Sequence, residues 1–251
     1  MNLSVNLNKI ALLRNSRGSD NPSLEDYANQ VIALGAQGIT LHPRPDHRHA
    51  TSQDAIAIAG ICKEQSVEFN LEGNPFTDSD DSFLGFAEIC AASKPDQVTL
   101  VPDTDNQLTS DSGWPAGYKA KELEAFLSSH QIKNTRTSLF IDADLRALEF
   151  AAINNFDRVE IYTGPFALAC MEDDALLIES QSSKITAVIQ RAAKLGIGVN
   201  AGHDLNLTNI PQLKLCGLIE EVSIGHAIIS DALKYGFKDT IMQYLKITRE
   251  A

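Results

Sequence analysis

The sequence lacks any apolar stretch close to the roughly 20 residues of a membrane-spanning helix. Its start, MNLSVNLNKIALLRNSRG, has too short an apolar run and is too polar for a secretory signal peptide. The four cysteines, Cys62, Cys90, Cys170 and Cys216, form no CxxC pair, so we expect no zinc site of that kind. In a chain of 251 residues, reduced core cysteines are a better interpretation than disulfides. We therefore expect a cytoplasmic protein.

Basic residues are in the minority. The chain has 21 Lys and Arg against 33 Asp and Glu, which gives a formal net charge of −12 at pH 7. This balance argues against a nucleic-acid-binding surface, because few cations are available to neutralise a phosphate backbone. Small phosphorylated ligands stay possible, since they need only a few local cations. There is also no GxSxG motif and no Cys beside a His, so neither type of hydrolase nucleophile is expected.

Short apolar runs rich in Val, Ile and Leu recur along the chain, and a segment with helical periodicity lies between successive runs. The expected strands are Leu3–Asn8, Gly38–Pro43, Glu68–Gly73, Gln97–Pro102, Thr137–Asp142, Arg158–Gly164, Gly198–Gly202 and Glu221–Gly225. The expected helices are Ser23–Leu34, Ser52–Gln65, Asp80–Ser93, Lys119–His130, Asp144–Asn154, Asp173–Leu195, Ala227–Tyr235 and Lys238–Arg249. Ser23, Asp80 and Asp144 suit helix N-termini, and Gly35 and Gly196 suit left-handed helix ends.

Eight alternations without a Pro- or Gly-rich linker favour one closed barrel over an open doubly wound sheet. The prediction is an α/β fold in which residues 1–251 form a single (β/α)8 TIM barrel with eight parallel strands and an extra C-terminal helix. The segment Asp103–Gly117 is longer than a usual connection and follows the fourth strand. It is either a lid over the site or a surface excursion.

Chemistry in such barrels sits at the C-terminal ends of the strands, and that rule selects His42, Glu72 and His203. Alternation directs His42 and Glu72 into the barrel mouth. His42 could instead be a hydrogen-bonded core histidine, and His203 could instead be a loop residue that caps the next segment. An inward carboxylate such as Glu72 rarely persists without a partner or a task. Gly202, just before His203, would let a ligand approach closely.

Two groups of residues at the same end of the barrel suit anions. Arg17, Arg44 and His49 can converge on a phosphate, because a guanidinium donates two parallel hydrogen bonds to it, although ordinary surface ion pairing is the alternative. Gly225 and His226 open a helix directly after the last strand, where unpaired N–H groups attract anions. The pattern indicates two phosphates, on one substrate or on two.

The segments VNLNKIALLRNSRG, GITLHPRPDHRH, FNLEGN, SLFIDAD, VEIYTG, VNAGHDL and SIGHAII carry a family resemblance over nearly the whole chain. In this order and spacing they resemble the pyridoxine 5′-phosphate synthase family of deoxyxylulose-dependent vitamin B6 biosynthesis. The resemblance implies condensation of 1-deoxy-D-xylulose 5-phosphate with 3-amino-2-oxopropyl phosphate to pyridoxine 5′-phosphate, phosphate and water. It also implies a homo-octamer that needs no metal and no organic cofactor.

The same resemblance implies roles for individual residues. His42 matches a first proton acceptor, Glu72 a second acid/base group and His203 a proton donor. The residues matching contacts to the deoxyxylulose phosphate are Arg44, His49, Thr109 and the pair Asn8-Lys9. Those matching contacts to the aminoketone phosphate are Asn6, Arg17, Asp204, Gly225 and His226.

Three positions depart from the common family pattern. Asn8-Lys9 stands where many members have an Asp-His pair, Asp204 replaces a glycine, and Tyr162 replaces a histidine. A carboxylate at position 204 disfavours a neighbouring phosphate unless its side chain turns away. A relative that uses a different phosphorylated ketose is therefore one alternative.

Two further alternatives concern the class of protein. His42, Glu72, Asp142 and His203 could instead bind a divalent metal for aldolase or isomerase chemistry. A non-catalytic sensor of sugar phosphates would bind the same ligands without turnover.

Overall fold

The computed structural model describes residues 1–104, 107, 109–129 and 132–250. The expected lid segment Asp103–Gly117 and the expected helix end at His130 therefore lie partly outside the described residues. No helix in the described part of the chain combines the length and apolar character needed to cross a membrane.

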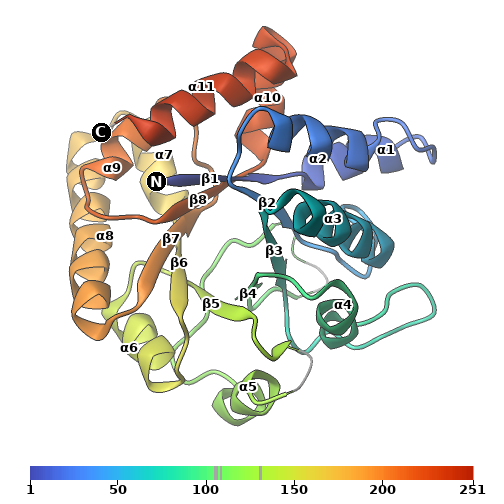
Figure 1. The fold of residues 1–251 in the computed structure, drawn as a ribbon. Helices are drawn as coiled ribbons and strands as arrows, with labels where there is room; N and C mark the ends of the chain where they lie inside the picture. Colours follow the sequence, from blue (N-terminus) through green and yellow to red (C-terminus); the bar gives the residue numbers. More distant parts are fainter. Residues whose placement is uncertain (105–106, 108, 130–131, 251) are drawn as a thin grey trace.

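Eight parallel strands close into a barrel in chain order, with β8 pairing back to β1 (Figure 1). The strands are β1 (Asn2–Asn6), β2 (Gly38–Leu41), β3 (Glu68–Gly73), β4 (Gln97–Leu100), β5 (Arg136–Ile141), β6 (Arg158–Tyr162), β7 (Gly198–Gly202) and β8 (Glu221–Ile224). The predicted barrel is confirmed.

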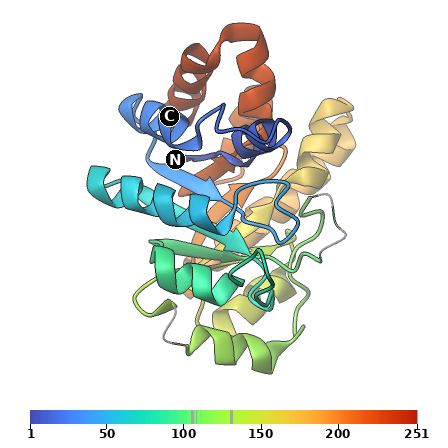
Figure 2. The same ribbon diagram turned by 90° about the vertical axis from the view of Figure 1, so that its right-hand side faces the viewer.

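Helices surround the barrel (Figure 1). They are α1 (Asn8–Asn15), α2 (Leu24–Ala33), α3 (Ser52–Gln65), α4 (Phe86–Ser93), α5 (Ala120–Leu127), α6 (Leu145–Ile153), α7 (Gly164–Met171), α8 (Ala175–Leu195), α9 (Ile210–Lys214), α10 (His226–Tyr235) and α11 (Phe237–Arg249). Figure 2 shows α10 and α11 lying side by side, and α11 is the expected extra C-terminal helix. The Arg249 guanidinium ties α11 to the turn after α2 by donating to the Gly35 carbonyl over 2.7 Å.

Side chains alternate between an apolar layer under the helices and a polar barrel interior. In β1, Leu3 is buried in the apolar cluster, whereas the Ser4 hydroxyl lies 2.7 Å from Thr40 Oγ1 on β2. Further round the barrel, the Thr99 hydroxyl donates to Asn70 Oδ1 over 2.9 Å. Because alternation has a period of two, the inward direction carries through to the residues at the strand ends. The polar rim is thus an extension of the polar interior.

Several helix ends follow the predicted local chemistry. Ser23 accepts a hydrogen bond from the Asp26 amide, and Asp144 accepts one from the Arg146 amide, so both are N-caps. Gly196 ends α8 with a φ of 73°, a left-handed conformation that glycine adopts without steric cost. Gly35, just after the end of α2, also has a positive φ.

Other boundaries were predicted wrongly. The first strand ends at Asn6, and Asn8 belongs to α1, because the Asn6 side chain accepts the Asn8 amide over 3.0 Å and turns the chain into a helix. Asp80 does not start a helix. Its carboxylate accepts the amides of Ser82 and Phe83 in a loop, and α4 begins only at Phe86.

Candidate active site

A cavity of about 660 Å³ opens at the C-terminal ends of the strands. It gathers every residue predicted for the site except Arg17, namely Asn6, Asn8, Lys9, His42, Arg44, His49, Glu72, Thr109, His203, Asp204, Gly225 and His226. These residues come from the ends of six strands, β1, β2, β3, β4, β7 and β8, and from the segments that follow them. The rule that barrel chemistry collects at this end therefore placed them correctly.

Arg17 does not line this cavity. It is exposed in the turn that follows α1. The eight residues of α1 lie between the first strand and Arg17. A helix of that length rises about 12 Å and carries Arg17 away from the strand end.

His42 and Glu72 lie together at the floor of the cavity. His42 Nδ1 is 3.8 Å from Glu72 Oε2, and both side chains are nearly buried. Burial, followed by the charges of Arg44, His49 and Arg48, holds the pKa of His42 well below its usual value. Burial and the Asp103 carboxylate raise the pKa of Glu72 to about 8, against the opposing influence of Arg44 and Ser223. Near neutral pH, Glu72 therefore carries a proton and His42 is a neutral base.

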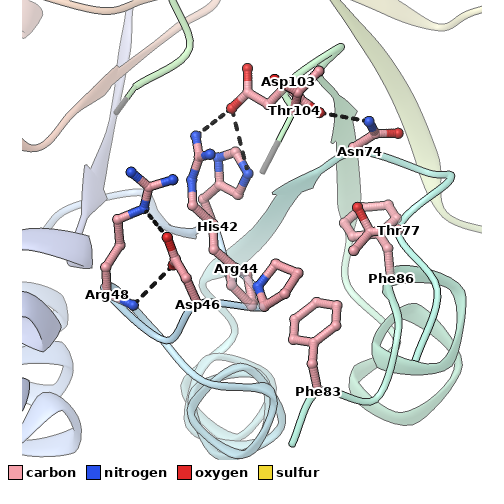
Figure 3. Close-up of a pocket in the computed structure, with 12 residues that line it drawn as sticks. His42, Arg44, Asp46, Arg48, Asn74, Thr77, Phe83, Phe86, Asp103 and Thr104 are labelled. Atoms are coloured by element: carbon pink, nitrogen blue, oxygen red, sulfur yellow. Dashed lines mark hydrogen bonds and ion pairs between the residues drawn. The ribbon is translucent and has the colours of Figure 1, made fainter. Parts of the chain in front are cut away.

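Asp103 connects His42 with Arg44 in a neighbouring pocket that shares these two residues with the cavity (Figure 3). Its Oδ2 forms an ion pair with Arg44 Nη2, accepts the Ser110 hydroxyl over 2.7 Å, and lies 3.9 Å from His42 Nε2. The Asn74 amide donates to the Asp103 backbone carbonyl over 2.7 Å and fixes the turn. From the sequence, Asp103 was predicted only as the start of a long loop. Asp103 follows Gln97 and Thr99 in steps of two residues, so alternation directs its side chain to the same inward side. This signal could have identified it.

A group of cationic or potentially cationic side chains surrounds this ion pair. Burial and the charges of Lys9, Arg44 and Arg48 lower the pKa of His49 to about 3, while Asp46 opposes the effect. Burial and the neighbouring Arg48 and Arg44 also lower the pKa of Lys9. Among the described residues, Arg44 Nε and His49 Nδ1 are buried without a hydrogen-bond partner. Buried unpaired donors beside like charges are the features that an anion would satisfy.

Glu160, on β6, was not predicted for the site. It is buried, lines the cavity, and lies close enough to Glu72 for their charges to interact. Burial, then Glu72 and Glu221, raise the pKa of Glu160 well above its usual value. Gly202 faces it, and a Cβ at that position would clash with Glu160 Oε1. The expectation that Gly202 leaves room for a ligand needs correction, because Glu160 fills this space.

His203 lines the cavity from the loop after β7. Its Nε2 lies 2.8 Å from the Thr109 hydroxyl, and its Nδ1 lies 2.9 Å from Asp204 Oδ2. The ring packs against the Tyr162 ring in an edge-to-face arrangement, with centroids 5.1 Å apart. The Asp204 side chain is thus turned onto the imidazole.

The N-terminus of α10 also opens on the cavity. Gly225 is its N-cap residue, no side chain caps the helix, and His226 is its first residue. A Cβ on Gly225 would lie 3.1 Å from three atoms of Asn6, so glycine allows β1 and this turn to pack closely. Free N–H groups and the positive end of the helix dipole make this a second place for an anion.

The side chains of the metal alternative do not form a metal-binding group. Within residues 1–104, 107, 109–129 and 132–250, no three His, Cys, Asp or Glu side chains have an arrangement that could hold an ion. His42 and Glu72 approach each other, but His203 is engaged by Asp204 and Thr109. The arrangement instead suits proton transfer between two anion sites.

Comparison with known proteins gives a consistent result. The family model described as pyridoxal phosphate biosynthesis protein PdxJ matches residues 3–250. A relative named pyridoxine 5′-phosphate synthase from Xanthomonas oryzae pv. oryzae is 44% identical over 251 residues, covering 98% of this chain and 96% of the relative. Its namesake from Xylella fastidiosa is 43% identical over 250 residues, covering 98% and 94%.

Solved structures with lower sequence identity share the fold. A tryptophan synthase chain from Mycobacterium tuberculosis superimposes with a TM-score of 0.65 at 13% identity, covering all of this chain and 93% of the other. Thiamine phosphate pyrophosphorylase from Pyrococcus furiosus gives a TM-score of 0.62 at 12% identity, covering 98% and 94%. At such identities, the likeness concerns the barrel alone.

Proposed function

This chain belongs to the PdxJ family of pyridoxal phosphate biosynthesis proteins, and on that premise we propose that it is a pyridoxine 5′-phosphate synthase. It condenses 1-deoxy-D-xylulose 5-phosphate with 3-amino-2-oxopropyl phosphate to give pyridoxine 5′-phosphate, inorganic phosphate and water. The observation that carries this proposal is a single cavity in which buried His42 and Glu72 lie 3.8 Å apart, together with two groups of residues suited to bind anions.

The two anion sites are assigned to the two substrates. Arg44, His49 and Lys9 hold the phosphate of the deoxyxylulose, using the unpaired donor at Arg44 Nε. The N-terminus of α10, at Gly225 and His226, holds the phosphate of the aminoketone. Fixing both phosphates brings the amine and the ketone together in a defined orientation, which replaces an improbable encounter in solution.

The acid/base groups are suited to a sequence of proton transfers. Ring closure requires amine addition to a carbonyl, Schiff-base formation, phosphate elimination, carbon–carbon bond formation and loss of water. Neutral His42 accepts the first proton, and Glu72, with a pKa near 8, can both release and accept one near neutral pH. His203 donates a proton to a leaving group from the loop after β7.

The direct test is incubation of the purified chain with both phosphates, with mass and absorbance used to detect pyridoxine 5′-phosphate. We expect product only when both substrates are present. The exposed-surface variant E64Q on α3 should retain activity and serves as a control. A folded protein that forms no product, even with enzyme in excess of substrate, would overturn the proposal.

A different ketose phosphate is the second candidate, and Asn8 is the observation that favours it. Asn8 is buried, and its Oδ1 accepts the His42 backbone amide over 3.0 Å. The oxygen is therefore already engaged, and a ligand would meet the N–H₂ group, a donor. Such a donor suits a ketose with an additional hydroxyl, so kcat/KM should be compared for 1-deoxy-D-xylulose 5-phosphate and D-xylulose 5-phosphate. A preference for the second would establish this alternative.

Three properties that the resemblance implies complete the proposal. We expect a homo-octamer, which sedimentation can measure, and activity that survives exhaustive chelation without an added organic cofactor. Activity lost on chelation and restored by one metal would instead favour the metal-dependent alternative. Fractionation of cells is expected to place the protein in the cytoplasm.

A further inference from the structure

His203 and Asp204 have an unusual backbone at the start of the loop after β7. Their φ angles are 85° and 57°, in the left-handed region that favours glycine. Hydrogen bonds hold this conformation: the Thr163 hydroxyl donates to the His203 carbonyl over 2.5 Å, and the Asn209 side chain donates to the Asp204 carbonyl over 3.0 Å. The loop therefore holds an imidazole and a carboxylate next to each other.

The Asp204 side chain contacts only one side of the His203 ring. Its Oδ2 lies 2.9 Å from Nδ1, while Nε2 lies on the other side, 2.8 Å from the Thr109 hydroxyl. The carboxylate is about half exposed, so this ion pair contributes little to stability. A glycine would fit the backbone at position 204 more easily, and stability thus gives no reason for an aspartate there.

We propose that Asp204 is a positioning residue that holds His203 in the form protonated at Nδ1, so that Nε2, the nitrogen beside the Thr109 hydroxyl, is the one that exchanges a proton with the substrate. The inference rests on the proposed function, which makes His203 the proton donor. The hydrogen bond to His203, together with the charges of His203 and His226, lowers the pKa of Asp204, so the carboxylate stays ionised and accepts the Nδ1–H bond. A histidine's second nitrogen partner commonly sets which nitrogen does the chemistry.

The proton balance of the step is simple. The imidazolium gives its Nε2 proton to a departing hydroxyl: the Nε2–H bond and the substrate C–O bond break, an O–H bond forms, and water leaves with the electron pair of the C–O bond. The ring returns to its neutral form with the proton still on Nδ1, and Nε2 is reprotonated from solvent. Asp204 neither gains nor loses a proton, since it stabilises the charged ring and fixes its orientation.

The test uses two variants and a matched control. D204G removes the carboxylate and suits the positive φ, so it should fold. D204N keeps the size, but its amide can present either O or N–H₂ to Nδ1 and selects neither tautomer. D173N is the control, because Asp173 is also an exposed aspartate with a positive φ, 53°, and lies outside the cavity.

Two readouts are needed. In the free protein, ¹⁵N NMR of the His203 ring at a pH where the ring is neutral should show predominantly Nδ1–H in wild type and D173N, and a loss of that preference in D204G and D204N. In turnover, kcat should fall about tenfold or more in both variants, the range seen when an outer partner of a functional histidine is lost. KM for the aminoketone phosphate should not rise in D204G, because a negative charge near the α10 N-terminus is removed.

The outcomes separate this inference from the proposed function. A wild-type enzyme that forms no pyridoxine 5′-phosphate refutes the proposed function, while the ring spectrum still tests the contact between Asp204 and His203. An unchanged ring spectrum in D204G, or an unchanged kcat despite a changed spectrum, overturns the positioning role. A KM that rises while kcat is constant would likewise overturn it, and would make Asp204 a substrate contact.

Discussion

Replacement of Glu72 by Gln should change both catalysis and the pH dependence of stability. Gln has nearly the shape of the protonated carboxyl but cannot release a proton. We expect E72Q to bind phosphate ligands as wild type does, and to lose about 10²-fold or more in kcat, as when a general acid/base is removed. Calorimetric titration with each phosphate, together with a turnover assay, separates these two effects.

The stability effect follows from the raised pKa. The pKa of Glu72 is about 8 in the folded protein against an ordinary value of 4.5. The Glu72 carboxyl has a higher pKa in the folded state than in the unfolded state. Its contribution to stability is therefore complete below the pKa of the unfolded state and is lost as the pH rises toward the pKa of the folded state. Wild type should lose about 1.4 kcal/mol per pH unit through this group across that window, and E72Q should not.

Urea unfolding at two pH values measures this difference. Between about pH 5.5 and about pH 7.5, the stability of E72Q relative to wild type should rise by about 3 kcal/mol. Glu160 and Glu221 are present in both proteins, so the part of their pKa shifts that burial causes cancels in the comparison. The part that the Glu72 charge causes is lost in E72Q and acts in the same direction. The exposed-surface control E64Q should show no such trend. If the difference in the free energy of unfolding between E72Q and wild type does not change with pH, the protonation state assigned to Glu72 is refuted. Near wild-type turnover in E72Q would refute its role.

Three other substitutions test separate parts of the site. H203A should retain phosphate binding in calorimetry while kcat falls about 10²-fold or more, and substantial turnover would remove His203 from the mechanism. D103A leaves the buried Arg44 charge without its partner, and chemical denaturation should show a loss of about 3–5 kcal/mol; a loss below about 1 kcal/mol would contradict the buried ion pair. G202A forces Glu160 to move, so we expect about 1–3 kcal/mol of destabilisation with a larger relative loss of turnover, and an unchanged variant would show that Glu160 is free to shift.

The barrel could be predicted because its signal is local and repeated. Each strand is a short Val-, Ile- or Leu-rich run, and β3 and β7 match the predicted bounds at both ends. The helix Ser52–Gln65 is also correct, because Thr51 and Asp54 form a capping box that fixes its first turn. Patterns with a clear period and a clear cap determine such segments with little help from tertiary contacts.

The missed helices lack those signals. The helix α9 has only five residues, and α7 is apolar on all sides, so neither shows an amphipathic period. The helix α1 begins where an apolar run continues from β1, and only the contact between the Asn6 side chain and the Asn8 amide shows that the strand has ended. The position of Arg17 after α1, outside the lining of the cavity, could not be predicted for the same reason, and its contact with a phosphate stays a prediction.

The sequence could predict which residues lie at the strand ends that form the candidate site. It could not predict which of their side chains contact one another. Alternation placed His42 and Glu72 in the barrel mouth correctly. The contact of Asp103 with Arg44 joins residues 59 positions apart in sequence, and the packing of Glu160 over Gly202 depends on the register of two neighbouring strands. No local pattern encodes such contacts, because they arise only when the barrel closes.

Quantitative product analysis tests the central claim most directly. The chain, incubated with 1-deoxy-D-xylulose 5-phosphate and 3-amino-2-oxopropyl phosphate, should release inorganic phosphate and pyridoxine 5′-phosphate in equal amounts. E72Q and H203A should release far less of both. The account would be contradicted if phosphate were released without the pyridoxine product. It would also be contradicted if the wild-type protein bound both substrates without turnover.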